Sequence, residues 1–427
     1  MTKWKEYCLL AVLLTRIIFC FSQETKVLNS FIRRNDTGFR LSGEPYYFIG
    51  TNYWYGPLLG NNKVDKIRLT EELSFLKAKG IFNLRILAGA EGSGNDNGMP
   101  RVSPPLQSGE GLFNKKVLQG LDFLLNEMSK RNMHAVIYLS NNWEWSGGFL
   151  QYVNWSGEIS RQKMNSRMTW DEQRYYVSKF YDCESCIRDY KKQVEVILNR
   201  RNIYNNRIYK NDPTIMAWEL ANEPRPMLQS SFNSFCRWIK NMSQYIRYID
   251  RNHLITIGSE GMAGTNDDIS LYKKINAYKN IDYLTIHIWP KNWGYFQDTS
   301  IAKSWTNIIN NSAKYIDEHT RIAEELHKPL VIEEFGLPRD KVSYDPQAKT
   351  NLRDEYYKFI FEESRKKGIA GCNFWAFGGL GRPDKGQVFW KAGDAWIGDP
   401  PNEEQGLNSV YNSDTSTWKV IESFMRP

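Results

Sequence analysis

The sequence predicts an α/β protein built as a (β/α)8 TIM barrel, and three observations support this fold class. Short runs of β-branched and aromatic residues alternate with longer segments whose apolar residues recur every three to four positions, which is typical of parallel strands joined by helical crossovers. The strand-like runs number eight, the count of a closed barrel of this type. No G-x-G-x-x-G follows the first run, so the nucleotide signature of the alternative, a doubly wound open sheet, is missing.

Eight segments carry the strand pattern. They are Tyr46–Asn52, Ile81–Leu87, His134–Ser140, Ile215–Asn222, Leu254–Glu260, Tyr283–His287, Leu330–Phe335 and Gly371–Ala376. The helical spacing of apolar residues lies between them. It covers Thr70–Lys79, Val117–Arg131, Asp189–Asn199, Ser231–Arg251, Ile301–Leu326 and Lys349–Lys367. Long loops at Ala88–Leu112, Asn141–Trp170 and Phe377–Gln405 follow predicted strands, which places them on the C-terminal face where barrel enzymes keep their sites.

The composition is that of an ordinary soluble globular protein, with 427 residues, 41% hydrophobic and 24% charged. The formal net charge is +8, but basic residues are interleaved with acidic ones, so we expect no nucleic-acid partner. Aromatic residues reach 14%, with 15 Trp and 24 Tyr. Because buried Tyr and Trp need partners for their polar groups, we expect some of these rings to face a ligand, with packing between helices and sheet as the alternative.

Residues 1–22 have the pattern of a signal peptide. Two lysines precede an apolar stretch from Tyr7 to Phe21, and a small residue follows at a plausible cleavage point. We therefore expect a secreted or extracytoplasmic protein in which residues 23–427 form one (β/α)8 domain, since no linker or internal repeat marks a second. Lipidation at Cys20 stays open as an alternative, as does a periplasmic or cell-surface location.

Four cysteines lie outside this leader, and two of them are close together. Cys183 and Cys186 form a lone C-x-x-C pair, whereas a zinc site of this kind needs a second pair that the chain lacks. A local disulfide in an oxidising compartment is the favoured state. Two unpaired buried thiols are the alternative.

Polar and aromatic residues gather at the predicted carboxyl ends of the strands. They are Asn52, Arg85, Asn141, Asn142, Trp143, Asn222, Glu223, Glu260, His287, Trp289, Glu334 and Trp375. The five His are scattered without metal-ligand spacing, so we expect no metal and no cofactor. Paired carboxyl groups and flat rings suit sugar chemistry instead, because carboxyl groups cleave glycosidic bonds and indole rings cover pyranose faces.

Two of these strand ends carry longer motifs, IMAWELANEPRP at Ile215–Pro226 and VIEEFG at Val331–Gly336. They resemble the fourth-strand and seventh-strand signatures of glycoside hydrolase family 5, in particular of its endo-β-1,4-mannanases. The resemblance runs from FIGTNYWYG, beginning at Phe48, to CNFWAFGG, ending at Gly379. The N-E-P triplet alone is a weak signal, but in register with H-x-W, E-F-G and F-W-A it is specific.

The resemblance implies a catalytic pair. Glu223 matches the family's general acid/base and Glu334 matches its nucleophile. Both must be carboxyl groups, because one protonates the leaving oxygen while the other, ionised, attacks the anomeric carbon, at a separation of about 5–5.5 Å in retaining enzymes. We therefore expect retention of configuration by double displacement.

The resemblance also implies binding residues around this pair. Arg85 matches the second-strand arginine that would hold the nucleophile ionised through a charge-assisted pair, with a salt bridge in the barrel wall as the alternative. His287 matches the histidine after the sixth strand, and Trp375 matches the eighth-strand tryptophan that would form the floor of the −1 subsite. Trp289 stands where many members have Tyr, which leaves open which group hydrogen-bonds the nucleophile.

Further aromatic and basic side chains are candidates for outer subsites. Trp143, Trp145 and Trp54 are plausible sugar platforms, each with core packing as the alternative. Arg225, two residues past the acid, is expected to reach the leaving-group side.

Strand parity separates neighbouring polar residues. Successive side chains alternate faces, so Glu333 is expected to point away from the barrel interior when Glu334 points into it. Glu219 shares parity with Glu223, and we expect it one layer deeper in a buried ion pair with an arginine. Asn222 falls off that face, so a role beside the nucleophile or the sugar 2-OH requires an irregular strand end.

The expected function is endo-acting hydrolysis of β-1,4-mannosidic bonds in mannan, glucomannan or galactomannan, by a chain that we expect to be monomeric. Another family 5 activity, such as endo-β-1,4-glucanase or exo-β-mannosidase, is the alternative, because fold does not decide activity. A non-catalytic polysaccharide-binding barrel is a further alternative. It predicts the loss of one carboxylate, and both are present.

Overall fold

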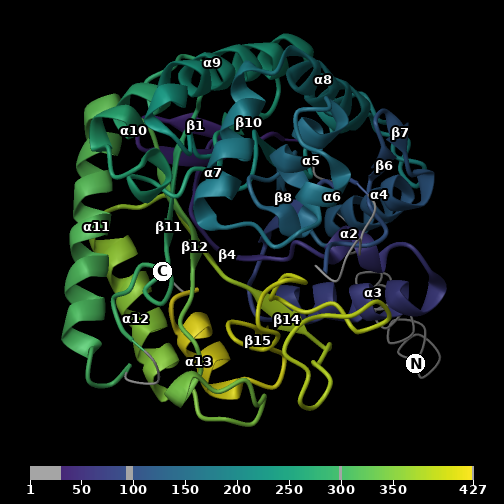
Figure 1. The fold of residues 1–427 in the computed structure, drawn as a ribbon. Coiled ribbons are helices and arrows are strands. Elements are labelled where there is room, and N and C mark those ends of the chain that lie inside the picture. The colour runs from purple at the N-terminus through teal and green to yellow at the C-terminus, as the bar shows by residue number, and fades with distance from the viewer. Residues whose placement is uncertain (1–29, 93–99, 298–300, 426–427) are drawn as a thin grey trace, which may run out of the picture.

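The structure is a computed structural model that describes residues 30–92, 100–297 and 301–425. The expected leader, residues 1–22, lies outside the described residues. A parallel sheet of eight strands forms the centre of the molecule, in the order β10-β9-β8-β5-β4-β13-β12-β11. Helices surround this sheet (Figure 1).

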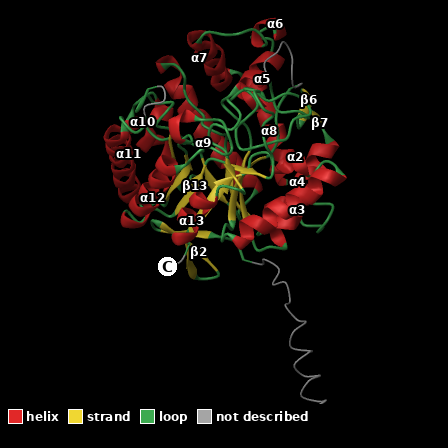
Figure 2. Cartoon of the chain, turned by 90° about the horizontal axis from the view of Figure 1, so that it is seen from below, coloured by secondary structure: helices red, strands yellow, loops and turns green. Residues whose placement is uncertain are grey.

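The two end strands of the sheet meet and close the barrel. Asp282 N donates to Ile255 O (2.8 Å), and His287 N donates to Glu260 O (3.0 Å), so backbone hydrogen bonds link β10 to the segment that leads into and through β11. Figure 2, turned by 90°, shows the strands at the centre of the helical ring. The (β/α)8 barrel predicted from the sequence is confirmed.

All eight predicted strands are present, and four of them, β8, β9, β10 and β13, end earlier than predicted. The eight strands are β4 (Phe48–Asn52), β5 (Asn83–Leu87), β8 (His134–Tyr138), β9 (Ile215–Glu219), β10 (Leu254–Thr256), β11 (Leu284–Ile288), β12 (Leu330–Phe335) and β13 (Gly371–Phe374). Every residue of these strands is buried, because one face packs on the barrel interior and the other on the helices. The shortened carboxyl ends free the residues that follow them to build a site.

The six predicted helices form most of the outer ring. They are α3 (Lys63–Ala78), α4 (Lys115–Ser129), α8 (Glu184–Leu198), α9 (Phe232–Ile249), α11 (Trp305–Leu326) and α12 (Asn351–Lys366). Their ends follow local chemistry: Asn62 caps α3 by accepting a hydrogen bond from Asp65 N (2.9 Å). The sequence pattern missed several shorter helices. Among them are α2 (Gly56–Leu59), α10 (Ile269–Asn276) and α13 (Thr415–Ser423), and three more lie between β8 and α8, in and after the predicted loop Asn141–Trp170.

A small antiparallel sheet covers the N-terminal end of the barrel. It consists of β1 (Arg33–Asn35), β2 (Gly38–Leu41) and β3 (Glu44–Tyr46). Phe39 packs edge to face on Tyr283, with ring centroids 5.4 Å apart, and stacks on Phe48. These rings join a buried apolar cluster with the first residues of the barrel strands, among them Val136 and Leu254. This end of the barrel is sealed, so a substrate must enter from the other end.

The C-terminal end of the barrel carries the long loops. The loop after β5 contains β6 (Gln107–Gly109) and β7 (Leu112–Phe113), and β14 (Phe377–Gly379) pairs with β15 (Val410–Tyr411) after the last strand. The segment between β8 and α8 contains α5 (Gly148–Trp155), α6 (Arg161–Met164) and α7 (Trp170–Ser178). Within the described ranges, none of the helices combines the length and hydropathy that crossing a membrane requires.

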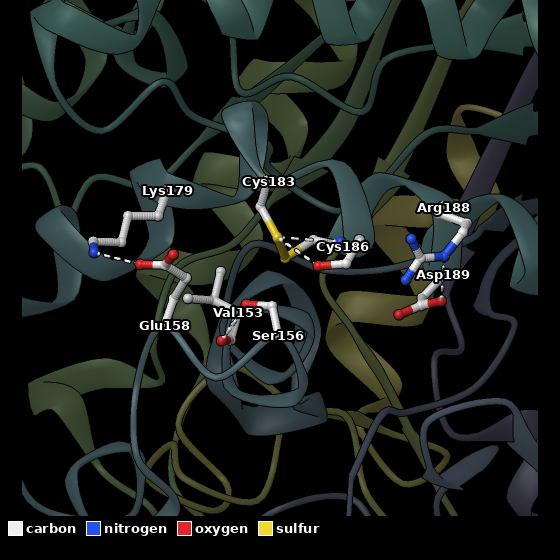
Figure 3. The surroundings of a disulfide bond; sticks show 9 residues. Val153, Ser156, Glu158, Lys179, Cys183, Cys186, Arg188 and Asp189 are labelled. Carbon is white, nitrogen blue, oxygen red and sulfur yellow. Dashed lines mark hydrogen bonds and ion pairs between the residues drawn. A yellow bond between two sulfur atoms is a disulfide. The ribbon is translucent and has the colours of Figure 1, made fainter.

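Cys183 and Cys186 form a disulfide at the start of α8, which confirms the predicted local bond. Figure 3 shows it near two ion pairs, Lys179 with Glu158 (2.7 Å) and Arg188 with Asp189 (3.7 Å). The other two cysteines, Cys236 and Cys372, are free and buried.

Replacing both disulfide cysteines with serine should lower stability slightly and leave catalysis nearly unchanged. The bond joins residues three apart, so it removes little freedom from the unfolded chain, and a loop of this size is worth at most about 2 kcal/mol. Thermal unfolding and kcat/KM of the double variant check this, with Cys372→Ser as the control for replacing a buried sulfur. Loss of activity in the double variant contradicts a purely structural disulfide, and loss of wild-type activity with a chelator contradicts the expectation that the protein needs no metal.

Candidate active site

A cavity of about 510 Å³ opens at the carboxyl ends of the strands. Its walls contain most of the residues singled out from the sequence. These are Trp143, Trp145, Asn222, Glu223, Arg225, Glu260, Trp289, Glu334 and Trp375. Arg85 and His287, both fully buried, contact the carboxyl groups of this wall from within the barrel. The predicted set therefore converges on one place, with one exception.

Glu223 is presented by an irregular strand end. Strand β9 stops at Glu219, and Asn222 forms an isolated parallel bridge to Asn141. Glu223 then adopts a positive φ of 50° while its backbone N donates to Gly258 O (2.9 Å). A non-glycine residue in the left-handed region costs free energy, and such strain is found where function requires it. The irregular end also turns Asn222 inward, as its expected position requires.

Arg85 organises the carboxyl groups of the barrel interior. Its Nε and Nη2 donate to both oxygens of Glu219 (2.9 and 2.6 Å), and Nη1 contacts Glu334 Oε1. The remaining donors reach the side-chain oxygens of Asn52 (3.0 Å) and Asn222 (2.7 Å). All five N–H groups of the guanidinium are thus used. The contact with Glu334 is the charge-assisted pair expected from the sequence.

The buried ion pair expected for Glu219 is confirmed, and its partner is Arg85. Burial raises the pKa of Glu219 to about 8, although Arg85 opposes the shift by favouring the carboxylate. Burial also lowers the pKa of the Arg85 guanidinium, but Glu219, Glu333 and Glu334 more than reverse this and keep it charged. The guanidinium is therefore a permanent cation at the base of the site.

His287 lies between the two carboxyl groups of the predicted catalytic pair. Its Nδ1 is 2.6 Å from Glu223 Oε1 and 3.3 Å from Glu334 Oε2, and its Nε2 is 3.6 Å from Glu333 Oε2. Burial lowers the pKa of His287, but the charge of Glu334 and the polar contacts with these three glutamates raise it well above its ordinary value. The ring is therefore an imidazolium that donates to carboxyl oxygens.

The expectation that Glu333 points away from the interior is wrong. The pairing of β11 with β12 is irregular: Ile286 lies opposite Ile332, and His287 lies opposite Glu334, so Glu333 is skipped. Its carboxylate reaches to within 3.6 Å of both Arg85 Nε and His287 Nε2. Simple alternation of faces holds only in an unbroken strand.

Trp289 supplies the hydrogen bond to the predicted nucleophile that a tyrosine would make in many family members. Its indole N–H donates to Glu334 Oε2 at 3.3 Å, so an indole occupies the place of the hydroxyl donor. Trp289 also packs edge to face on Trp375, with centroids 5.9 Å apart. The two rings form one wall of the cavity beside Glu334.

Trp143 and Arg225 lie on the side of Glu223. The Trp143 indole N–H donates to Glu223 Oε2, and the Arg225 guanidinium lies 5.0 Å above the Trp143 ring. Arg225 is itself held by both oxygens of Glu260 (2.5 and 2.6 Å). On its outer side Trp143 stacks at 6.1 Å on Trp170, the half-exposed first residue of α7. The sequence interpretation missed Trp170, because nothing in its local pattern indicates the neighbour it meets.

Trp54 is the predicted site residue that does not reach the cavity. It is 1% exposed, donates from its indole N–H to Gly398 O (2.8 Å), and packs edge to face on Trp145 and Trp396. Trp54 packs behind Trp145 and does not line the cavity. Core packing, the alternative considered for this position, is therefore its role. Tyr55, Trp145 and Trp396 pack around the buried ring and leave no face open to a sugar.

The loop after β13 contributes lining residues that the sequence interpretation did not single out. Glu403 and Glu404 line the cavity, and Glu404 forms an ion pair with Lys291 at 2.9 Å. Burial, with the charges of Asp399, Glu334 and Glu223, raises the pKa of Glu403 to about 8. Loop length was the signal available in the sequence, but only the folded path of the loop brings these carboxyl groups to the site.

Glu223, His287 and Glu334 each offer a ligand atom within 4.8 Å of the others, which is a geometry that a metal ion can use. The existing contacts argue against it. The contacting atoms already have partners within the protein: His287 Nδ1 lies on the oxygens of Glu223 and Glu334, and Arg85 pairs with Glu334. The arrangement suits proton transfer and nucleophilic attack by two carboxyl groups better than metal binding.

Comparisons with known proteins agree with this geometry. A family model described as GH family 5 beta-mannosidase-like matches residues 29–426. Mannan endo-1,4-beta-mannosidase 4 of Solanum lycopersicum is 30% identical over 375 residues, which cover 84% of this chain and 87% of that protein. Mannan endo-1,4-beta-mannosidase 7 of Arabidopsis thaliana is 28% identical over 422 residues, covering 95% of this chain and 88% of its own.

Solved structures show the same relationship. A glycoside hydrolase family 5 mannosidase from Rhizomucor miehei has a TM-score of 0.83 at 33% identity and covers 93% of this chain and 97% of its own. A mutant of that protein was solved in complex with mannosyl-fructose. The endo-1,4-beta-D-mannanase from Thermotoga petrophila RKU-1 has a TM-score of 0.65 at 26% identity and covers 89% of this chain and 99% of its own.

Proposed function

This chain belongs to glycoside hydrolase family 5, and from that membership we propose that it hydrolyses β-1,4-mannosidic bonds within mannan, glucomannan or galactomannan by double displacement. The observation that carries the proposal is the pair Glu223 and Glu334 with nearest oxygens within 4.8 Å. This separation suits the retaining geometry of about 5–5.5 Å, whereas inverting enzymes need about 6.5–9.5 Å to admit a water. The curated relatives named above are endo-acting mannanases.

In the first step Glu334 is the nucleophile. Arg85 holds one of its oxygens and the Trp289 indole N–H holds the other, so the carboxylate is oriented beside a permanent cation. An oxygen of Glu334 attacks the anomeric carbon while Glu223 gives its proton to the glycosidic oxygen. The glycosidic bond breaks, the aglycone leaves with that proton, and a glycosyl ester forms on Glu334.

In the second step Glu223 acts as the base. A water molecule gives its proton to Glu223 and attacks the anomeric carbon, which releases Glu334 and returns Glu223 to its protonated form. The Trp143 indole N–H and His287 Nδ1 lie on the two oxygens of Glu223. These donors fix the carboxyl group and stabilise its charge between the two steps.

Selection of mannose is assigned to the groups around Glu334. Mannose and glucose differ in the orientation of the 2-OH, which lies next to the nucleophile, so stacking on Trp375 cannot distinguish them. Asn222, His287 and Trp289 supply the polar atoms at this point. A site arranged for one orientation leaves its polar groups unpaired with the other, a mismatch that costs orders of magnitude in kcat/KM.

Mannan and manno-oligosaccharides should therefore be cleaved in preference to cellulose. Reducing-sugar release from soluble mannan and from carboxymethylcellulose, together with the products of mannohexaose and cellohexaose, measures this preference. We expect intermediate oligosaccharides from mannohexaose as the early products and little action on either glucan. Comparable rates on the two polymers contradict the proposal.

Exo-acting β-mannosidase activity is the second candidate, and one observation favours it. The Rhizomucor miehei mannosidase has the higher TM-score of the two solved structures described above, 0.83 against 0.65. Lys291, after β11, and Glu404, after β13, both line the cavity and form an ion pair that links the two loops. Mannose as the sole early product from mannohexaose supports this candidate instead.

We further propose that residues 1–22 are removed on export and that residues 23–427 act as a secreted monomer. The Cys183–Cys186 disulfide supports export, because such bonds persist in oxidising compartments. N-terminal sequencing of the protein from the culture medium and its mass in solution test both statements.

A further inference from the structure

Glu333 is a buried carboxylate that the proposed mechanism does not use. Its backbone O accepts a hydrogen bond from Asn52 Nδ2 (3.0 Å), and the β11–β12 pairing skips it. The side chain is 0% exposed and lies beneath the catalytic pair. Two consecutive glutamates of one strand therefore reach the same interior.

The surroundings of this carboxylate are unusual. Both of its oxygens are buried and accept no hydrogen bond from any described residue, although leaving a buried polar group without a partner destabilises a protein, and more so if the group is charged. Its close polar neighbours are two cations, Arg85 Nε and His287 Nε2, each 3.6 Å from Oε2. All five N–H donors of Arg85 are hydrogen-bonded to residues other than Glu333. His287 Nε2 has no hydrogen-bond partner among the described residues either.

We propose that Glu333 is a positioning residue of the reaction, whose negative charge holds the proton on His287 Nε2 and so keeps His287 an imidazolium facing Glu223. The proposal rests on the assignment of Glu223 and Glu334 made above. The ring is clamped between two sets of carboxyl groups: Glu223 and Glu334 at Nδ1, and Glu333 at Nε2. Glu333 acts through His287 and does not touch the substrate.

The consequence for the reaction lies in the charge on Glu223. When Glu223 gives its proton to the leaving oxygen it becomes a carboxylate 2.6 Å from His287 Nδ1. An imidazolium at this distance stabilises the new charge, whereas a neutral imidazole does so less well. Glu333 sets which form is present, because a nearby negative charge favours the protonated ring.

Several other charged and titratable groups face this cluster. They are Arg85 from β5, Glu219 from β9, Glu223 and Glu260 from the segments after β9 and β10, Glu334 from β12, Glu403 from the loop after β13, and the hydroxyls of Tyr138, Tyr272 and Tyr283. Arg85 and the glutamates other than Glu333 remain in place when Glu333 alone is changed. Glu219 is a suitable control, because it is another buried glutamate of the same interior but hydrogen-bonds to Arg85 and not to His287.

The test is the pH dependence of kcat/KM on soluble mannan for Glu333→Gln, Glu333→Asp and Glu219→Gln. Gln keeps the volume and removes the charge. Removing a negative charge makes it easier for His287 to lose a proton, so the imidazolium, and with it the alkaline limb of kcat/KM, should be lost at lower pH, by about one to three units for charges this close. Glu333→Asp keeps the charge and should keep the limb near its wild-type position. An unmoved limb in folded Glu333→Gln, or an equal shift in Glu219→Gln, overturns the proposal.

A second measurement does not depend on the variants folding. The side-chain ¹⁵N signals of His287 in the wild-type protein report whether Nδ1 and Nε2 both carry protons. We expect an imidazolium throughout the pH range of full activity, and a neutral ring in that range overturns the proposal. The same signals distinguish a failure of the proposed function from a failure of the role proposed for Glu333. Absence of mannan hydrolysis by the wild type refutes the proposed function, while the titration of His287 still reports its coupling to Glu333.

Discussion

Glu334→Ala and Glu223→Ala should each abolish mannan hydrolysis while the barrel remains folded. Loss of Glu334 removes the atom that forms the glycosyl ester, so neither step proceeds. Loss of Glu223 removes the acid and base, a contribution of about 10²–10⁴-fold, and the first step should survive only with a leaving group that needs no proton. Rates on mannan and on an activated aryl β-mannoside separate the two variants.

The covalent intermediate gives the sharper form of this test. A slow substrate with a good leaving group should trap a sugar on Glu334, which peptide mass mapping locates. The matched control is Glu71→Ala, an exposed glutamate of α3 far along the chain from both motifs, which should keep wild-type rates. A sugar found on Glu333, or product of inverted configuration, refutes the assignment.

Arg85→Met should cause the second large effect, on both stability and activity. The change deletes five hydrogen bonds and leaves Glu219, Glu333 and Glu334 buried without their common cation. Breaking a buried charge cluster from one side costs about 3–5 kcal/mol. Activity should fall as well, because Glu334 loses the cation that holds it in place.

The stability loss in Arg85→Met should depend on pH, and its sign follows from Glu219. With Arg85 present, burial already raises the pKa of Glu219 to about 8, above the ordinary value of 4.5. The folded state therefore binds a proton that the unfolded state releases, and stability falls as pH rises through this window. Arg85 lowers this pKa, so in the variant the pKa of Glu219 should lie higher still, and the extra loss of stability relative to the wild type should develop as the pH rises above about 8. Thermal unfolding of both proteins on either side of this pH measures the growing deficit.

Arg353→Met is the matched control for this prediction. Arg353 is equally buried and binds Asp414 (2.9 Å) and Thr417 (3.0 Å), but it lies away from the cavity lining. It should lower stability and keep kcat/KM per folded molecule. A folded Arg85→Met protein with wild-type kcat/KM contradicts the role given to Arg85.

Local sequence patterns were enough to predict the architecture and the centre of the site. Eight strand segments and six helices were predictable because apolar periodicity reports which face of each element is buried, and this signal is local. The motifs around Glu223 and Glu334 lie directly after strands, so the barrel order places both at one end. The ion pair of Glu219 followed from the same parity.

Where simple alternation of strand faces fails, and which side chains meet across loops, depends on the packing of distant segments. The skipped residue in the β11–β12 pairing turns Glu333 inward, and the strained end of β9 turns Asn222 toward Arg85. Trp54 is buried behind Trp145, while Glu403 reaches the cavity from a distant loop. Local patterns carry no information on these features, because strand register and loop path are set by packing between segments far apart in the chain.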